Sequence, residues 1–192
     1  FRHNNNTIRE YIRNFIMSTL ETNLIQPSTG TTLTLGASGD TINTPSGVTI
    51  SGGLTNTPSF YVYKNAVQAI AHATETVVTW QVERFDTDSA FASNTFTVPS
   101  GKGGKYLFNA AIRWDTDTDF QGVRLTLRKN SSNFSSAWTR NEYYQTQQLT
   151  SILDLSATDT VDVVCRQTQG GSIDIGDADS GDISWFQGFK LT

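Results

Sequence analysis

The stretch NTFTVPSGKGGKYLFNAAIRW, residues 94–114, decides the fold class of this chain. Apolar and polar residues alternate before and after a turn that contains Pro-Ser-Gly and Gly-Gly. A period of two is typical of half-buried strands, and these turn residues are typical of tight connections between them. We therefore expect strands at 95–98 and 105–113, joined through that turn.

The same alternation continues from Thr57 to the end of the chain, where helical periodicity is absent. Turn-forming residues separate the alternating stretches at 130–132, 157–159 and 170–171. No segment has the pattern of a βαβ unit, which argues against a parallel sheet with a nucleotide crevice. Many short strands with frequent turns predict an all-β sandwich or jelly-roll head over residues 57–192. The other expected strands are 59–63, 76–82, 123–128, 147–155, 160–166 and 183–191.

Residues 1–26 differ in pattern, and we expect an anchoring helix region there. In TIREYIRNFIMSTLE, residues 7–21, apolar residues recur at helical spacing opposite charged ones, and Thr7 and Glu10 have the spacing of a capping box. So short a helix is marginal in water, so its stripe must pack on its own head, on symmetry copies or on another protein. Met17 is also compatible with a translation start, which would make the residues before it an extension. The expected contact stripe is Ile8, Tyr11, Ile12, Phe15 and Ile16.

Residues 27–56 are rich in Ser, Thr and Gly and precede the head. Alternating pieces at 32–35 and 48–50 are separated by turn sequences, and each piece is too short to be stable alone. Three identical copies wound together would bury their Leu, Val and Ile residues as a thin β stalk. The alternative is a flexible linker, for which this composition is equally typical.

Composition argues against several classes of function. The net charge is -4, with 14 basic and 18 acidic residues, and no basic run is interleaved with aromatics, so nucleic acid is not an expected partner. Only 36% of the residues are hydrophobic and no long apolar run occurs, so membrane insertion is not expected. The amino end shows no apolar segment followed by a signal cleavage site.

Catalytic chemistry is not expected either. The two histidines, His3 and His72, lie near no recognisable nucleophile motif. Cys165 alternates with Val161 and Val163, which predicts a buried thiol and not a reactive one. We therefore expect a protein that is not an enzyme.

Two groups of residues are candidates for binding. Four carboxylates in the glycine-punctuated loop GGSIDIGDADSGD are candidate ligands for Ca²⁺, the alternative being solvated acidic turns: Asp174, Asp177, Asp179 and Asp182. The polar stretch NFSSAWTRNEYYQTQ, residues 133–147, is expected to be rich in turns and offers Trp138, Arg140, Tyr143 and Tyr144 for recognition. The alternative for these aromatics is packing in the head or at a subunit seam, which we expect for Phe108, Trp114, Phe186 and Phe189.

The head resembles the C1q-like globular domain. The resemblance implies a C1q/TNF-like jelly roll that forms homotrimers and binds proteins or glycans through exposed loops and faces. It is carried, in order, by TPSFYVYKN (57–65), TVVTWQVERFDTDSAF (76–91), NTFTVPSGKGGKYLFNAAIRW (94–114), GVRLTLRKN (122–130), LTSILDLSATDTVDVVC (149–165) and DISWFQGFKL (182–191).

Residues 32–53, TLTLGASGDTINTPSGVTISGG, resemble sequences in bacteriophage fibre or spike proteins. This resemblance implies a virion protein on the particle surface whose head recognises a host surface glycan or protein, while the amino-terminal segment contacts other virion proteins. One alternative is a capsid or head decoration protein with a mainly structural role. Another is a secreted C1q-like lectin, which the missing signal peptide disfavours.

Overall fold

The structure is a computed structural model, and it describes residues 39–41, 43, 46, 57–115, 122–140, 145–176 and 183–191. The chain divides into two compact units, residues 1–49 and 50–192, and every described strand belongs to the second. The expected helix region lies outside the described residues, as does nearly all of the expected stalk. Within the described part of the chain, no helix is long and apolar enough to span a membrane.

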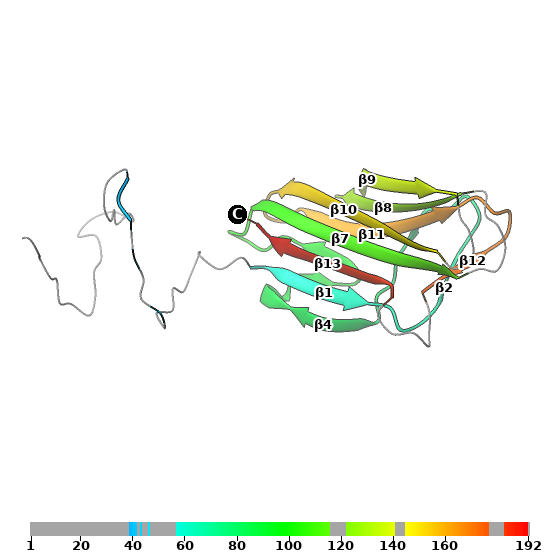
Figure 1. The fold of residues 1–192 in the computed structure, drawn as a ribbon, viewed down its shortest axis with the longest axis horizontal. Coiled ribbons are helices and arrows are strands. Elements are labelled where there is room, and N and C mark those ends of the chain that lie inside the picture. Colours follow the sequence, from blue (N-terminus) through cyan, green and yellow to red (C-terminus); the bar gives the residue numbers. More distant parts are fainter. Residues whose placement is uncertain are drawn as a thin grey trace, which may run out of the picture. The chain divides into compact units, whose positions relative to one another are not determined.

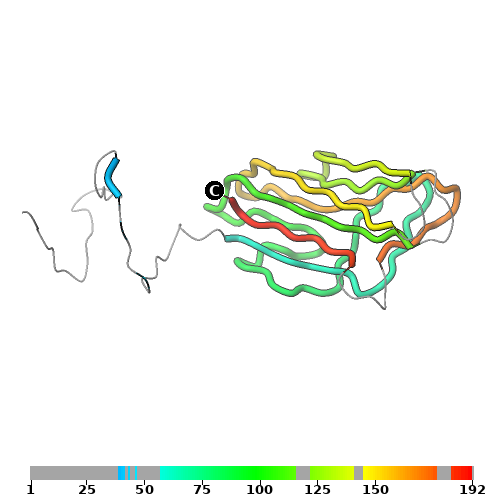
Figure 2. The backbone as a smooth tube through the Cα atoms, viewed as in Figure 1, coloured from blue at the N-terminus to red at the C-terminus, as the bar shows by residue number. Residues whose placement is uncertain are grey.

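Two antiparallel sheets form the head (Figures 1 and 2). The first contains β1 (Ser59–Tyr63), β2 (Gln68–Ile70), β4 (Val82–Asp86), β7 (Gly104–Asp115), β10 (Thr146–Leu155), β12 (Ile173–Ile175) and β13 (Trp185–Lys190). Its order is β2-β12-β7-β13-β1-β4, and β10 pairs with the other side of β7. The second contains β3 (Thr76–Val77), β5 (Phe91–Ala92), β6 (Thr95–Thr97), β8 (Val123–Lys129), β9 (Ser132–Thr139) and β11 (Thr160–Gln167). Its order is β5-β6-β11-β8-β9, with β3 also on β11. The all-β expectation is confirmed.

The core lies between the two sheets and is rich in phenylalanine. The Phe60 ring from the first sheet is 4.9 Å from that of Phe186 and 5.2 Å from that of Phe96 in the second sheet. Each fully buried side chain of this size contributes about 1.5–3 kcal/mol. Gly188 makes room for these rings, because a Cβ there would lie 2.6 Å from Phe108 Cδ1. The alternation in the sequence thus places one face of each sheet in a common core.

Seven of the expected strands are present, but the single strand expected at 76–82 was wrong. The chain instead forms β3 in the second sheet, crosses over, and forms β4 in the first. Side chains interrupt the ladder: the Thr79 N–H donates to Gln68 Oε1 and the Trp80 N–H donates to Asn94 Oδ1, both at 2.8 Å. These backbone donors are therefore satisfied without a neighbouring strand.

The turn-rich prediction for the stretch that begins at residue 133 was also wrong, because β9 occupies residues 132–139. Asn130 and Ser131 have φ of 50° and 62°, as a two-residue hairpin turn of type I′ requires, and they fold β9 back onto β8. Alternation is present in β9, but its large residues Phe134 and Trp138 point to solvent and its small residues point inward. A strand whose large apolar residues face solvent lacks the usual sign of a buried face, so its sequence resembles that of a loop.

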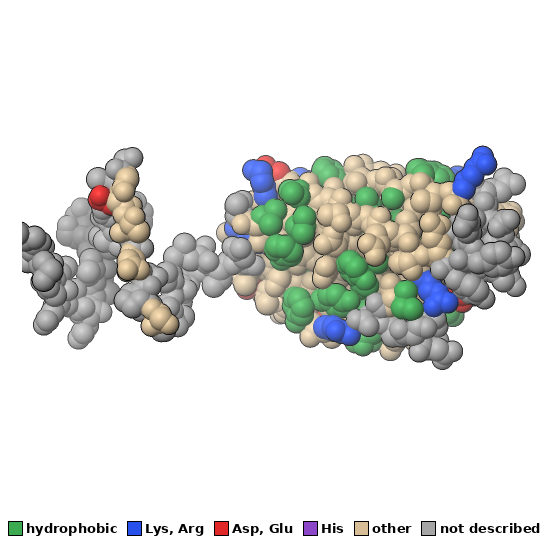
Figure 3. Space-filling model, in the orientation of Figure 1, with side chains coloured by type: hydrophobic (Ala, Val, Ile, Leu, Met, Phe, Trp, Pro, Cys, Tyr) green, Lys and Arg blue, Asp and Glu red, His purple; other side chains and the backbone are tan. Residues whose placement is uncertain are grey.

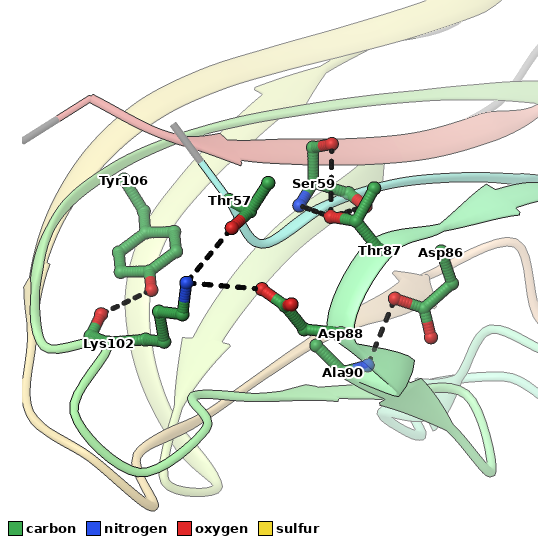
Figure 4. A network of polar contacts seen from close by, with 8 residues as sticks. All are labelled: Thr57, Ser59, Asp86, Thr87, Asp88, Ala90, Lys102 and Tyr106. Atoms are coloured by element: carbon green, nitrogen blue, oxygen red, sulfur yellow. Dashed lines mark hydrogen bonds and ion pairs between the residues drawn. The ribbon is translucent and has the colours of Figure 1, made fainter. Parts of the chain in front are cut away.

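A polar network fixes the turn between β4 and β5 (Figure 4). Asp86 accepts the Ala90 N–H at 2.9 Å through Oδ1 and the Phe91 N–H at 2.8 Å through Oδ2. Asp88 and Ser89 have positive φ, so this turn is held in a conformation that side chains disfavour. The two carboxylate bonds from Asp86 offset that cost.

Candidate functional site

The tryptophan with the most exposed side chain among the described residues lies on the outer face of the second sheet. Trp138 on the edge strand β9 is 52% exposed. Its cross-strand partner on β8 is Arg124, and the partner of Arg124 on β11 is Arg166. Because facing residues on neighbouring strands share one side of a sheet, these three side chains form a row. We call this row the tryptophan platform.

Both guanidinium groups lie over the indole. The distance from Cζ to the ring centroid is 5.2 Å for Arg124 and 5.9 Å for Arg166, within the range of cation–π contacts. The indole also approaches Gly122, where an added Cβ would lie 3.5 Å from Cζ3 of the ring. The ring therefore packs against the start of β8 and still leaves half of its surface to solvent.

The two arginines of the platform differ in whether a carboxylate pairs with them. Arg124 forms an ion pair with Glu75, whose Oε1 also accepts Nδ2 of Asn133 at 3.1 Å. Arg166 donates through Nε to the carbonyl of Ala73 at 3.2 Å, and among the described residues it has no carboxylate partner. Burial, and then the nearby charge of Arg166, lower the pKa of Arg124. Among the described residues, the platform therefore carries one positive charge without a carboxylate partner, in a protein whose net charge is -4.

The structure brings one of the four expected recognition residues to this place. Trp138 is exposed there, while Arg140 follows the end of β9 and is not one of the guanidinium groups over the indole. Tyr143 and Tyr144 lie outside the described residues. Sequence reasoning missed Arg124 and Arg166, although their place among alternating apolar residues would have put both on an outer face.

The expected calcium site stays a prediction. Asp174 on β12 lies opposite Asp115 on β7, and both are partly buried. Asp177, Asp179 and Asp182 lie outside the described residues. The part of the chain that the structure describes contains no group of three or more His, Cys, Asp or Glu residues that could hold a metal ion.

A second surface lies on the outer face of the first sheet and is rich in apolar side chains. Ile152, Leu107 and Phe189 follow one another across β10, β7 and β13. Ile152 is 55% exposed. Tyr61 stacks beside Trp185 with ring centroids 6.1 Å apart. Figure 3 shows that apolar and uncharged polar side chains cover most of this side, with charged groups mainly at its periphery. We call this surface the aromatic face, and its members are Tyr61, Phe85, Leu107, Ile152, Trp185 and Phe189.

Comparison with solved structures decides what this fold is. The globular domain of zebrafish complement 1qA matches with a TM-score of 0.52 and 18% identity, covering 71% of this chain and 98% of that domain. Murine APRIL, in crystals at pH 8.0, matches with a TM-score of 0.54 and 12% identity, covering 70% and 98%. The head is a C1q/TNF-like jelly roll. No protein-family model and no curated protein matches the sequence. At these identities the similarity shows the fold alone.

The remaining reactive side chains of the jelly roll have structural surroundings. His72 Nδ1 accepts the Gly170 N–H at 2.8 Å and so joins two loops. Cys165 is fully buried, as expected, and burial raises the pKa of its thiol far above the usual range, with a smaller opposing effect of Lys64. Of the aromatics expected in the core or at a seam, Phe108, Trp114 and Phe186 are buried, whereas Phe189 belongs to the aromatic face.

Proposed function

We propose that this chain forms a homotrimeric, non-enzymatic binding protein that associates through the aromatic face and recognises a surface ligand through the tryptophan platform. The observation that carries this proposal is that the two outer faces differ in chemistry. One face consists mainly of apolar and uncharged polar side chains, with the Arg84 guanidinium over the rings of Tyr61 and Tyr63. The other face places an exposed indole beside Arg166, which has no carboxylate partner among the described residues. Such a division suits a subunit that must contact both its own copies and a ligand.

Self-association is supported by the size of the apolar groups exposed on the aromatic face. Contiguous exposed apolar surface is unusual on monomers and often marks a protein interface. Ile152, Phe85 and Phe189 are 55%, 48% and 39% exposed, so burying them would contribute a substantial part of the 1.5–3 kcal/mol that each such side chain contributes when fully buried. The family resemblance implies three copies, and closed rotational symmetry would bury this face on every copy.

Recognition through the platform is supported by its residue types. Tryptophan and arginine are enriched among the residues that contribute most to binding energy. An indole offers a flat apolar surface with a polar edge, and it loses little conformational entropy on binding because it has only two side-chain torsions.

We further propose a bacteriophage virion as the setting, with the head on a fibre or spike that contacts the host surface. Support comes from the sequence of residues 32–53, which resembles phage fibre proteins, and from the apolar stripe at residues 8–16, which would contact other virion proteins. Both segments precede the head, so they would connect it to the particle.

Light scattering on the full chain tests the assembly, and adsorption tests the recognition. We expect a mass three times that of the 21.1 kDa chain. The purified protein should also adsorb to cells of a susceptible host, and Trp138→Ala should abolish adsorption without changing the mass. A monomeric full chain would contradict the assembly, and adsorption independent of Trp138 would contradict the role of the platform.

A further inference from the structure

We infer that the tryptophan platform binds an acidic saccharide, with a sugar ring stacked on Trp138 and a carboxylate paired with Arg166. This inference rests on the proposed function and names the class of ligand for that site. Three features of the described residues carry it: the half-exposed indole, a guanidinium without a described carboxylate partner, and a second exposed aromatic residue on the same strand.

The first feature is the exposure of the indole. Arg124, Arg166 and Gly122 lie against Trp138, yet the residue remains 52% exposed. The two side chains that lie over its ring, Arg124 and Arg166, are both charged. A sugar ring has an apolar face of C–H groups and a rim of hydroxyls, which matches an apolar ring surrounded by hydrogen-bonding groups.

The second feature is the Arg166 guanidinium, which favours a ligand with a negative charge. Glu75 compensates Arg124, but Arg166 uses Nε for the Ala73 carbonyl and has no described carboxylate partner for the rest of its fork. A guanidinium presents parallel N–H groups that fit a carboxylate. An anion at this position would also reduce the repulsion between Arg166 and Arg124. A carboxylate-bearing sugar therefore satisfies the fork while its ring stacks on Trp138.

The third feature is the exposed ring of Phe134, which favours a ligand several sugars long. Phe134 lies four residues before Trp138 on β9, where the pairing register with β8 shifts, and is also 52% exposed. Four residues of strand span about 13 Å. Ser136 lies between the two rings, with its hydroxyl 2.8 Å from that of Thr126. A chain of several sugars along β9 would contact both rings, so an oligosaccharide should bind better than its monomer.

Single-stranded nucleic acid also combines flat rings with negative charge, but the platform suits it less. Nucleic-acid grooves follow the phosphates with many cationic groups. Here two guanidinium groups are accompanied by the carboxylate of Glu75, and the whole chain has a net charge of -4. These charges favour one carboxylate beside the indole over a continuous run of phosphates.

Titration calorimetry on the full chain tests the inference, with tetragalacturonate as the acidic probe and maltotetraose as a neutral probe of equal length. We expect tetragalacturonate to bind at least tenfold more tightly than maltotetraose and than galacturonate monomer. Arg166→Gln should remove most of the preference for acid, a loss of about tenfold that corresponds to one charge-assisted hydrogen bond. Trp138→Ala should abolish binding of both probes. Retained melting temperatures for both variants would show that the fold is intact.

Arg84→Gln is the matched control, because it removes the same charge from an exposed position on β4 of the other sheet. It should leave the preference for acid unchanged, and an equal loss in both arginine variants would overturn the pairing with Arg166. Equal affinity for both probes, or tighter binding of a single-stranded oligonucleotide, would overturn the acidic saccharide. Each of those results would leave the proposed recognition function standing if it depended on Trp138, whereas host adsorption independent of Trp138 would overturn the proposed function itself.

Discussion

The side chain of Gln147 on β10 donates to the carbonyl of Ala137 on β9 at 2.7 Å and so joins the two sheets. Its Oε1 accepts the indole N–H of Trp114 at 3.3 Å, and Gln147 itself is almost fully buried. Ala137 precedes Trp138 in the chain. A buried amide of the first sheet therefore helps to hold the strand that presents the candidate site on the second.

Gln147→Leu should lower the free energy of unfolding by about 2 kcal/mol or more, because it leaves a buried indole N–H and a backbone carbonyl without partners. Urea denaturation followed by circular dichroism measures the change. Gln148→Leu changes an exposed neighbour on the same strand and should cost less than about 0.5 kcal/mol. Equal losses in the two variants would contradict the role of the buried amide.

Gly188→Ala should destabilise the head by about 1–3 kcal/mol or more, because overpacking forces the core to shift. The new Cβ would lie 2.6 Å from Phe108 Cδ1 and 2.9 Å from Phe60 Cε1. Thermal unfolding measures the loss. Gly171→Ala provides the control, since an added Cβ there meets nothing within 4 Å, and an unchanged melting temperature for Gly188→Ala would show that the rings can move aside.

Lys64 should make stability depend on pH. Burial lowers its pKa from 10.5 to about 8, with a smaller opposing effect of Cys165. Between those values the unfolded chain holds the proton and the folded chain does not, so the free energy of unfolding rises with pH from about 8. Two other groups oppose this rise, because burial raises the pKa of the Cys165 thiol above its ordinary value of 9.0 and, aided by Asp88, raises that of Tyr106 from 10.0 to about 12. The unfolded chain then releases these protons first, above about pH 9 for Cys165 and above about pH 10 for Tyr106, so the net rise is confined to the range between pH 8 and pH 9.

Urea denaturation of the protein and of Lys64→Met at pH 7, 8, 9 and 10 measures this dependence. Lys64→Met should remove the rise in stability between pH 8 and pH 9, and above pH 9 the variant should lose stability more steeply, because Lys64 no longer offsets the effect of Cys165. A rise of equal size in the variant would show that other groups cause it.

Asp86→Ala should cost about 1–3 kcal/mol, because two backbone N–H groups of a turn with positive φ lose their acceptor. Asp86→Asn keeps one side-chain oxygen as an acceptor and should lose less. Chemical denaturation of the three proteins would give this order of stability, and identical stabilities would mean that water replaces the carboxylate.

Ile152→Glu should convert the proposed trimer into a monomer, because it places a charge at the most exposed end of the apolar row of Ile152, Leu107 and Phe189. Sedimentation velocity measures the change. Phe134→Glu is a matched control, since Phe134 is similarly exposed but lies on the other sheet, and it should leave the assembly unchanged. A trimer that persists in Ile152→Glu would place the interface elsewhere.

Local pattern was sufficient for most of the fold. Strands such as β7 and β11 contact the core on one side, so the period-two alternation of their residues predicts both their conformation and their buried face. The failures have a common cause in contacts between residues distant in sequence. The strand expected at 76–82 is interrupted because the backbone N–H groups of Thr79 and Trp80 donate to the side chains of Gln68 and Asn94. The sequence of that segment alone does not reveal these partners.

At the candidate site, too, some features follow from the local sequence and others from contacts between distant residues. Composition and alternation are local properties, so they were enough to place Trp138 in a polar stretch and to predict an all-β sandwich or jelly roll. The folded chain was needed to show that β9 is an edge strand with its large residues outward, and that Arg124 and Arg166 share a row with Trp138. The reason is physical: strand neighbours are set by the pairing register, which depends on how the whole chain buries its core and not on any one segment.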